Sequence, residues 1–155
     1  MAVMHRCGWM VIRMEYKLTI PGRLDGLNSY TAANRTNPHK GGKVKKDNEA
    51  QVIWCIRQQL RGVHIERPVL IYYHFYEKDN RRDGDNILSC ATKFIQDSLT
   101  KTAVLQEDNR RCIPHFYHDV TVDKKNPRIE VTITELTPEQ AEMKLKDLLK
   151  DLETG

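Results

Sequence analysis

The spacing of apolar residues along this chain predicts an alternation of strands and helices. The run Val69–Tyr76 is apolar on both faces, which predicts a central strand. Apolar residues that recur at intervals of three and four predict helices over 47–61 and 86–100. Further strands are predicted over 14–20, 110–120 and 128–134, and Pro114 indicates that the second of these is an edge or bulged strand.

The last twenty residues predict a further helix. Thr137-Pro138-Glu139-Gln140 has the form of a capping box with proline at the first helical position. The apolar stripe that follows needs a surface to cover. Together the elements predict one α+β domain, a mixed β-sheet of about four strands with helices packed against it, in the order β-α-β-α-β-β plus a C-terminal helix.

Three segments of the chain differ in character. Residues 1–13 have no clear period and are expected to be a poorly ordered extension, with Met14 as a sensible start. Residues 14–136 hold the predicted sheet and its helices, and residues 137–155 hold the amphipathic C-terminal helix. No internal repeat or second domain is evident.

A basic stretch lies between the first strand and the first helix. Residues 26–46 contain no acid, and Pro38, Gly41 and Gly42 predict a long loop. Loops of this length inside compact domains are usually functional or disordered. Its cations are Arg35, Lys40, Lys43, Lys45 and Lys46.

The charge of the chain is modest but unevenly placed. Of the 155 residues, 30% are charged and 39% hydrophobic, and the net charge is +4. The segment 136–155 has five acids and three lysines, hence −2, which leaves +6 for residues 1–135. A basic body favours a polyanionic partner. The four cysteines have no paired spacing, and no stretch reads as a secretory signal or a membrane span, which favours a cytoplasmic protein with reduced thiols.

Candidate chemistry lies in the segment Arg81-Arg82-Asp83-Gly84-Asp85-Asn86. On extended backbone, Asp83 and Asp85 would project to the same side, about 7 Å apart. Carboxylates of this kind suit Mg²⁺, and the two arginines suit a phosphate. The alternative is a solvated turn in which an aspartate or asparagine caps the following helix.

Other sites fit less well. A calcium loop around Gly84 fails at two liganding positions, and Gly41-Gly42-Lys43 lacks the first glycine and the hydroxyl of a phosphate loop. Cys112, His115 and His118 are spaced by three on a predicted strand, so neighbours point to opposite faces and a zinc site is disfavoured.

Three blocks together resemble the RusA family of Holliday junction resolvases. They are Arg82–Ile87, Lys93–Leu99 and Val104–Asn109, with weaker likeness over about 18–136. The family reads Asp-x-Asp-Asn, then a helix with a lysine, then an acidic pair. In shorter members the lysine follows the first motif by one helical turn, where this chain has Ser89, whereas Lys93 comes one turn later.

The resemblance implies a magnesium-dependent endodeoxyribonuclease, with Mn²⁺ as a substitute. It implies that Asp83, Asp85 and Asp108 hold the metal and that Lys93 is catalytic. Three more residues would contact the metal ligands without touching the metal: Glu107, Asn86 and Asn28. Glu107 could instead act as an additional ligand or as a base. The DNA contacts would come from Arg35, Lys40, Lys43, Lys45, Lys46, Arg81 and Arg82. For Lys93 the alternative role is an ion pair with Asp97.

The resemblance also implies partners and a setting. A homodimer would nick opposing strands of a four-way DNA junction in recombination and repair, because its two-fold symmetry matches that of the junction. No membrane and no small-molecule cofactor are expected, and the setting is the cytoplasm of bacteria or their prophages. Two alternatives stay open: a nuclease for flaps or forks, and a junction-binding protein without cleavage activity.

Overall fold

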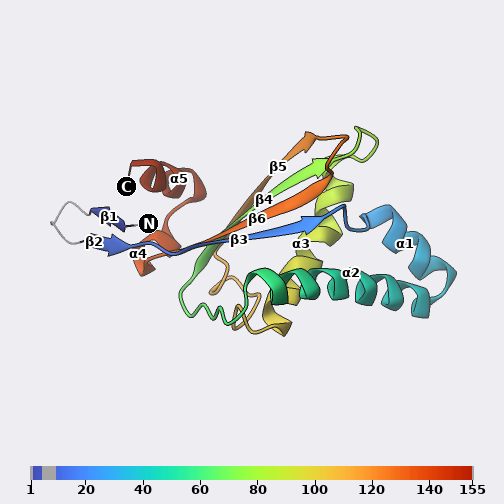
Figure 1. Cartoon of the computed structure of the whole chain (residues 1–155), viewed down its shortest axis with the longest axis horizontal. Helices are drawn as coiled ribbons and strands as arrows, with labels where there is room; N and C mark the ends of the chain where they lie inside the picture. The colour runs from blue at the N-terminus through green and yellow to red at the C-terminus, as the bar shows by residue number, and fades with distance from the viewer. Residues whose placement is uncertain (1, 5–9, 155) are drawn as a thin grey trace.

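A four-stranded mixed sheet forms the centre of the computed structural model, which describes residues 2–4 and 10–154 (Figure 1). Its strand order is β3-β6-β4-β5, where β3 is Glu15–Pro21, β6 Arg128–Glu135, β4 Val69–Glu77 and β5 His115–Val122. Only β4 and β5 run parallel to each other; the remaining neighbours are antiparallel. The predicted α+β class, the mixed sheet and the order of elements are confirmed. β4 is internal, and β5 begins directly after Pro114 and lies at an edge.

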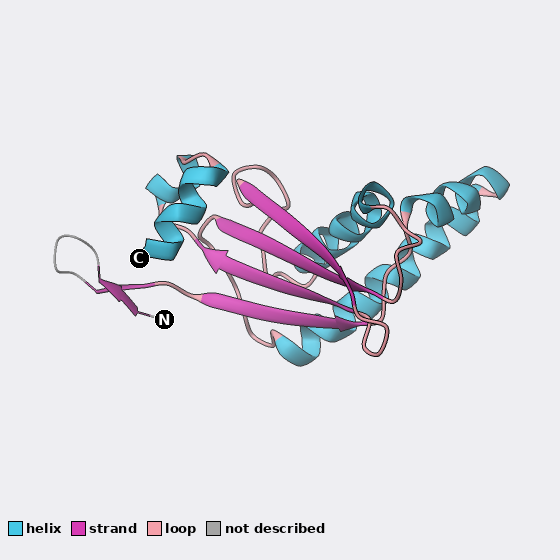
Figure 2. Ribbon diagram, turned by 90° about the horizontal axis from the view of Figure 1, so that it is seen from above, coloured by secondary structure: helices cyan, strands magenta, loops and turns pink. Residues whose placement is uncertain are grey.

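Two long helices cover one face of the sheet. They are α2 (Pro38–Gln59) and α3 (Gly84–Lys101), and Figure 2 shows this face covered and most of the other open. Inward residues such as Ile71, Tyr73 and Phe75 of β4 pack against them in the main core. Since each such side chain contributes about 1.5–3 kcal/mol when fully buried, this face determines how α3 lies on the sheet.

The basic stretch 26–46 is helical, so the loop prediction was wrong. α1 (Leu27–Thr36) is followed almost at once by α2, and the two pack side by side as a hairpin. Pro38 begins α2 rather than breaking it, because Asn37 caps the helix and proline at the first position loses no bond. Gly41 lies where a Cβ would overlap the side chain of Asn34, so glycine lets the two helices approach closely.

The C-terminal segment covers one end of the other face. α4 (Pro138–Glu142) begins with the predicted capping box of Thr137 and Gln140. α5 (Leu145–Thr154) is a separate helix, so the single predicted helix is broken near Met143. Leu148 packs with Leu70 and Leu136 in a second, smaller core, which supplies the surface that the apolar stripe required.

The N-terminal segment contains two short strands. β1 (Ala2–Met4) pairs antiparallel with β2 (Met10–Ile12), while residues 5–9 of the expected extension lie outside the described residues. Among the residues that the structure describes, no helix has the length and apolar character that crossing a bilayer would require.

Candidate functional site

Asp83 and Asp85 lie at the start of α3, just beyond the end of β4. Asp83 caps the helix, since its Oδ1 accepts a hydrogen bond from the backbone N–H of Asn86 at 2.8 Å. Asp85 lies in the first turn, where the helix dipole favours a negative charge. Only Asp83 is on extended backbone, so the expected extended pair is instead a cap and a first-turn residue. Both side chains are exposed, and capping uses one oxygen of Asp83.

Asn86 joins the start of α3 to the start of α1. Its Oδ1 accepts a hydrogen bond from the backbone N–H of Asn28 at 3.0 Å. A Cβ on Gly26 would lie 2.6 Å from the same oxygen, so a larger residue there would push the two helices apart. Asn28 and Asn86 thus bring two helix N-termini together beside Asp83. The positive ends of two helix dipoles favour an anion such as a phosphate group.

Arg82 is held by a buried carboxylate. Its Nη2 and Nε donate to the two carboxylate oxygens of Glu77 at 2.5 and 3.2 Å, and its Nη1 donates to the carbonyl of Leu24 at 2.8 Å. Arg23 lies 3.5 Å from the same carboxylate. A DNA contact by Arg82 would compete with these bonds. Arg81, in contrast, has a side chain that is 86% exposed.

Asp108 follows α3 in the chain and contacts that helix at Lys93, whereas Asp83 and Asp85 lie at its start. Its Oδ2 is 3.4 Å from Lys93 Nζ, which is also 3.2 Å from Asp97 Oδ1. Lys93 comes eight residues after Asp85, or about 12 Å of helix rise. Lys93 therefore makes the ion pair with Asp97 that is its alternative role, and it contacts the predicted ligand Asp108 as well.

A row of charged side chains with alternating sign runs from α3 onto α2; its members are Asp108, Lys93, Asp97, Lys45, Glu49 and Lys101. Lys45 Nζ lies 3.4 Å from Asp97 Oδ2 and 3.6 Å from Glu49 Oε1, and Lys101 also contacts Glu49. Glu49 is buried, and its Oε1 has no hydrogen-bond partner among the described residues. These ion pairs connect α2 with α3, and a DNA contact by Lys45 would compete with them.

The pKa shifts in this row follow its charges. The hydrogen bond and charge of Asp97 raise the pKa of Lys93, and Asp108 adds to the effect. Burial alone would lower the pKa of Lys45, but Asp97 and Glu49 outweigh it and the pKa is raised. Burial would likewise raise the pKa of Asp97, yet its hydrogen bonds with Asp108 and Lys93 hold it below the usual range. Both lysines are firmly cationic.

The carboxylates fit magnesium in part. Asp83 and Asp85 offer hard oxygens on an exposed surface, which suits an ion that keeps several waters and takes one or two carboxylates. Asp108 contacts Lys93 and Asp97, and within the described part of the chain no hydrogen bond or ion pair joins it to Asp83 or Asp85. Within residues 2–4 and 10–154, no three histidine, cysteine or acidic side chains are grouped so as to hold a metal.

The remaining predicted residues are at the surface. Glu107 is exposed and accepts a hydrogen bond from the side chain of Asn109. The outer cations of the α1–α2 hairpin are exposed and make no ion pair within the described part of the chain; they are Arg35, Lys40, Lys43 and Lys46. In Figure 1, α1 and the beginning of α2 extend past the end of the sheet.

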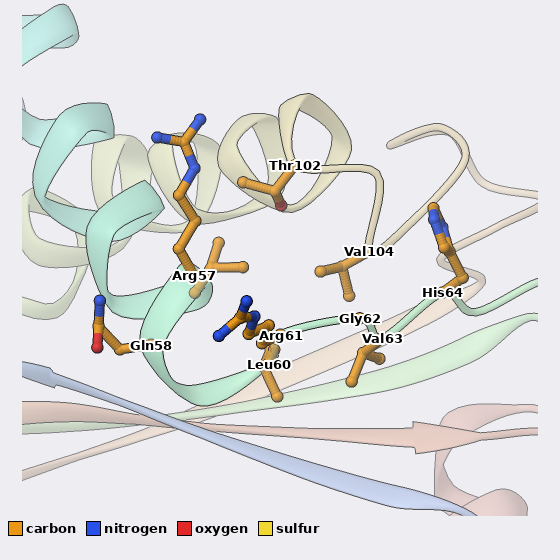
Figure 3. Close-up of a pocket in the computed structure, with 10 residues that line it drawn as sticks. Arg57, Gln58, Leu60, Arg61, Gly62, Val63, His64, Thr102 and Val104 are labelled. Atoms are coloured by element: carbon orange, nitrogen blue, oxygen red, sulfur yellow. The ribbon is translucent and has the colours of Figure 1, made fainter.

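A hollow of about 510 Å³ lies at the far end of α2 and α3 (Figure 3). Arg57 and Arg61 line one side and His64 the other, over apolar residues that include Val104. No carboxylate is among its lining residues, so it would attract anions. Thr102 in its wall ends α3, whereas Asp83 begins that helix, so the hollow and the carboxylate pair are separate.

Comparison with known proteins leaves the family open. No family model matches this chain, and no curated protein matches it.

Two groups of charged residues in this region were missed from the sequence. Glu77 pairs with Arg82 behind the carboxylate pair, and Glu49 joins Lys45 and Lys101 beside Asp97. The sequence signal for Glu77 was an acid closing a strand of otherwise apolar character, where a buried charge requires a partner. The Glu49 group depends on how α2 crosses α3, for which the sequence offers no local signal.

Proposed function

We propose that this chain is a Mg²⁺-dependent, structure-selective endodeoxyribonuclease that resolves Holliday junctions by paired nicks in DNA recombination and repair. One observation carries the proposal: Asp83-Gly84-Asp85-Asn86, Lys93 and Glu107-Asp108 follow one another as in the RusA family. The exposure of Asp83 and Asp85 beside two helix N-termini supports it, since carboxylates favour Mg²⁺ and helix N-termini favour a phosphate.

The metal would be held by Asp83 and Asp85, with Asp108 as the predicted third ligand. When bound, Mg²⁺ lowers the pKa of a coordinated water and offsets charge on the phosphate. The chain itself would orient the phosphate by the positive ends of the α1 and α3 helix dipoles. Lys93 and the exposed Arg81 supply positive charge, which stabilises the charge that develops on the phosphate.

The α1–α2 hairpin would contact the DNA backbone. Its exposed cations neutralise phosphates without reading bases, which suits recognition of a branched shape rather than a sequence. A homodimer would place two such surfaces about a two-fold axis, in keeping with the symmetry of a four-way junction. The proposal places the enzyme in the cytoplasm and requires no small-molecule cofactor.

A second candidate is a junction-binding protein without cleavage activity. The pairing of Asp108 with Lys93, rather than with Asp83 and Asp85, favours it. A nuclease for flaps or forks would use the same surfaces, so only the choice of substrate separates it from a junction resolvase.

Cleavage of a synthetic four-way junction with and without Mg²⁺ tests the proposal. Asp83→Asn should abolish cleavage and leave junction binding unchanged or tighter. Asparagine still caps a helix, so the variant should keep its fold. Asp147→Asn is the matched control, because Asp147 is an exposed aspartate on α5, at the opposite end of the sheet.

Three outcomes distinguish the candidates. Loss of cleavage in Asp83→Asn but not in Asp147→Asn supports the nuclease. Tight junction binding by the wild type with no cleavage in Mg²⁺ or Mn²⁺ would support the junction-binding protein without cleavage activity. Faster cleavage of flaps or forks than of four-way junctions would assign the alternative substrate.

A further inference from the structure

The two outer edges of the sheet differ in whether their outward main-chain N–H and C=O groups have hydrogen-bond partners. Along β3, the side chain of Gln59 accepts from the N–H of Thr19 and donates to its carbonyl, both at 2.7 Å. Gln51 donates to the carbonyl of Pro21 at 3.0 Å. Because these glutamines replace a neighbouring strand, β3 offers little to a further strand.

The other edge, β5, has no such cover. It pairs with β4 on one side, and Figures 1 and 2 show its other side open. Among the described residues, no hydrogen bond satisfies the outward main-chain groups of His115–Val122. The strand contains neither the lysine nor the proline that usually blocks an open edge, and Asp119 is its one acid.

The apolar face of the sheet also continues onto β5 beyond the helices. The register places Phe116, Val120 and Val122 on the same face as the buried Ile71 and Phe75 of β4. Yet these three side chains are 47%, 39% and 43% exposed, respectively. Among the described residues, β5 therefore combines an edge whose outward main chain is unpaired with an apolar row that is only partly covered.

We propose that β5 pairs antiparallel with β5 of a second copy of this chain about a two-fold axis, which joins two sheets into one of eight strands. The row is self-complementary when reversed, because an axis at His118 sets Phe116 opposite Val120 of the second copy. The same axis sets Tyr117 opposite Asp119 of the second copy. An axis at Asp119 would instead oppose two like charges, which is unfavourable.

This inference names the interface of the homodimer expected under the proposed function, but it rests on the edge strand and not on nuclease activity. The test therefore uses the protein alone, without DNA or metal. A monomer that still cuts junctions would overturn the interface only, and a dimer that cuts nothing would overturn the nuclease only.

The first experiment measures the mass of the full chain in solution by sedimentation over a range of concentrations. The wild type should approach twice its chain mass of 18.1 kDa. Val120→Lys, which adds a blocking charge to an exposed position, should be monomeric at concentrations where the wild type is dimeric. Trp54→Lys is the control, since Trp54 on α2 is 64% exposed and lies outside the edge.

The second experiment tests the axis by disulfide formation. In a background with Cys7 and Cys112 changed to serine, His118→Cys should oxidise to a covalent dimer. Paired residues across antiparallel strands lie about 4.5–5.5 Å apart at Cα, which a disulfide spans. Asp119→Cys would lie opposite Tyr117 of the second copy and not opposite its own counterpart, beyond the reach of a disulfide, so it should remain reduced.

The proposal fails on any of three results. They are a wild type that stays monomeric, a dimer that Val120→Lys leaves intact, and a dimer that Trp54→Lys dissociates. Cross-linking of Asp119→Cys in place of His118→Cys would overturn the axis at His118. Circular dichroism of each variant shows whether it is folded, and a folded Val120→Lys that remains dimeric is decisive.

Discussion

Glu77 should matter far more to stability than an exposed carboxylate, because it is buried between arginines. It is 2% exposed, accepts two hydrogen bonds from Arg82 and lies 3.5 Å from Arg23. Removing one partner of a buried ion pair costs about 3–5 kcal/mol, since the other charge stays desolvated. The Arg82 side chain is 15% exposed, so water relieves part of that cost. We expect Glu77→Ala to lower the free energy of unfolding by about 3 kcal/mol.

Urea unfolding measures this loss, and the melting temperature should fall by about 6–12 °C. Glu130→Ala is the matched control, because Glu130 pairs with Arg128 at 2.8 Å near the surface, where such pairs contribute about 0–1 kcal/mol. Adding Arg82→Ala to Glu77→Ala should recover part of the loss, because it removes the stranded charge. Similar losses for Glu77→Ala and Glu130→Ala, or no recovery in the double variant, would refute the reasoning.

Two further predictions concern the lysines. Replacing Lys40, Lys43 and Lys46 together by alanine should weaken binding to all junction sequences alike and reduce the slope of log K against log[salt] by about 0.9 for each phosphate that the protein no longer neutralises. Lys45→Ala should lower stability and leave that slope unchanged, because Lys45 faces Asp97 and Glu49; equal slopes for both variants would contradict this. Lys93→Ala should lower the single-turnover cleavage rate by about 10²–10³ with junction affinity unchanged. Asp97→Asn should keep the cleavage rate but lose less stability on acidification than the wild type. The lowered pKa of Asp97 stabilises the fold above the ordinary aspartate pKa, and this contribution is lost as the pH falls through the pKa of the folded state. Full activity in both variants would make Lys93 structural.

The sequence predicted elements well where one local pattern dominates. The apolar run of β4 and the spacing along α3 needed no knowledge of the remainder of the chain, and the capping box at Thr137 marked the start of α4 within a residue. The basic stretch failed because Pro38 and Gly41 have two meanings. Proline also starts helices, and glycine also lets helices approach closely, and only the packing of α1 on α2 selects between them.

The contacts of the candidate site likewise fall into local ones, which the sequence predicts, and long-range ones, which it does not. Asp83 and Asn86 lie three residues apart, and Lys93 and Asp97 four, so their contacts follow from the helix itself. The contact between Lys45 and Asp97 joins residues more than fifty positions apart. Pairs of that kind depend on the register of α2 on α3, which hydrophobic packing determines and charge patterns do not reveal.

The place of Asp108 is the point on which nuclease and binding protein differ most. Lys93 and Lys45 together balance the two neighbouring carboxylates of Asp97 and Asp108, so their contact needs no metal. The Lys93 side chain is 61% exposed, however, and exposed pairs contribute only about 0–1 kcal/mol. So small a contribution does not hold Asp108 against a divalent cation that binds carboxylate oxygens directly. Asp108→Asn should therefore abolish cleavage together with Asp83→Asn if Asp108 joins the metal, and cleavage at the wild-type rate would leave Asp108 as a partner of Lys93 alone.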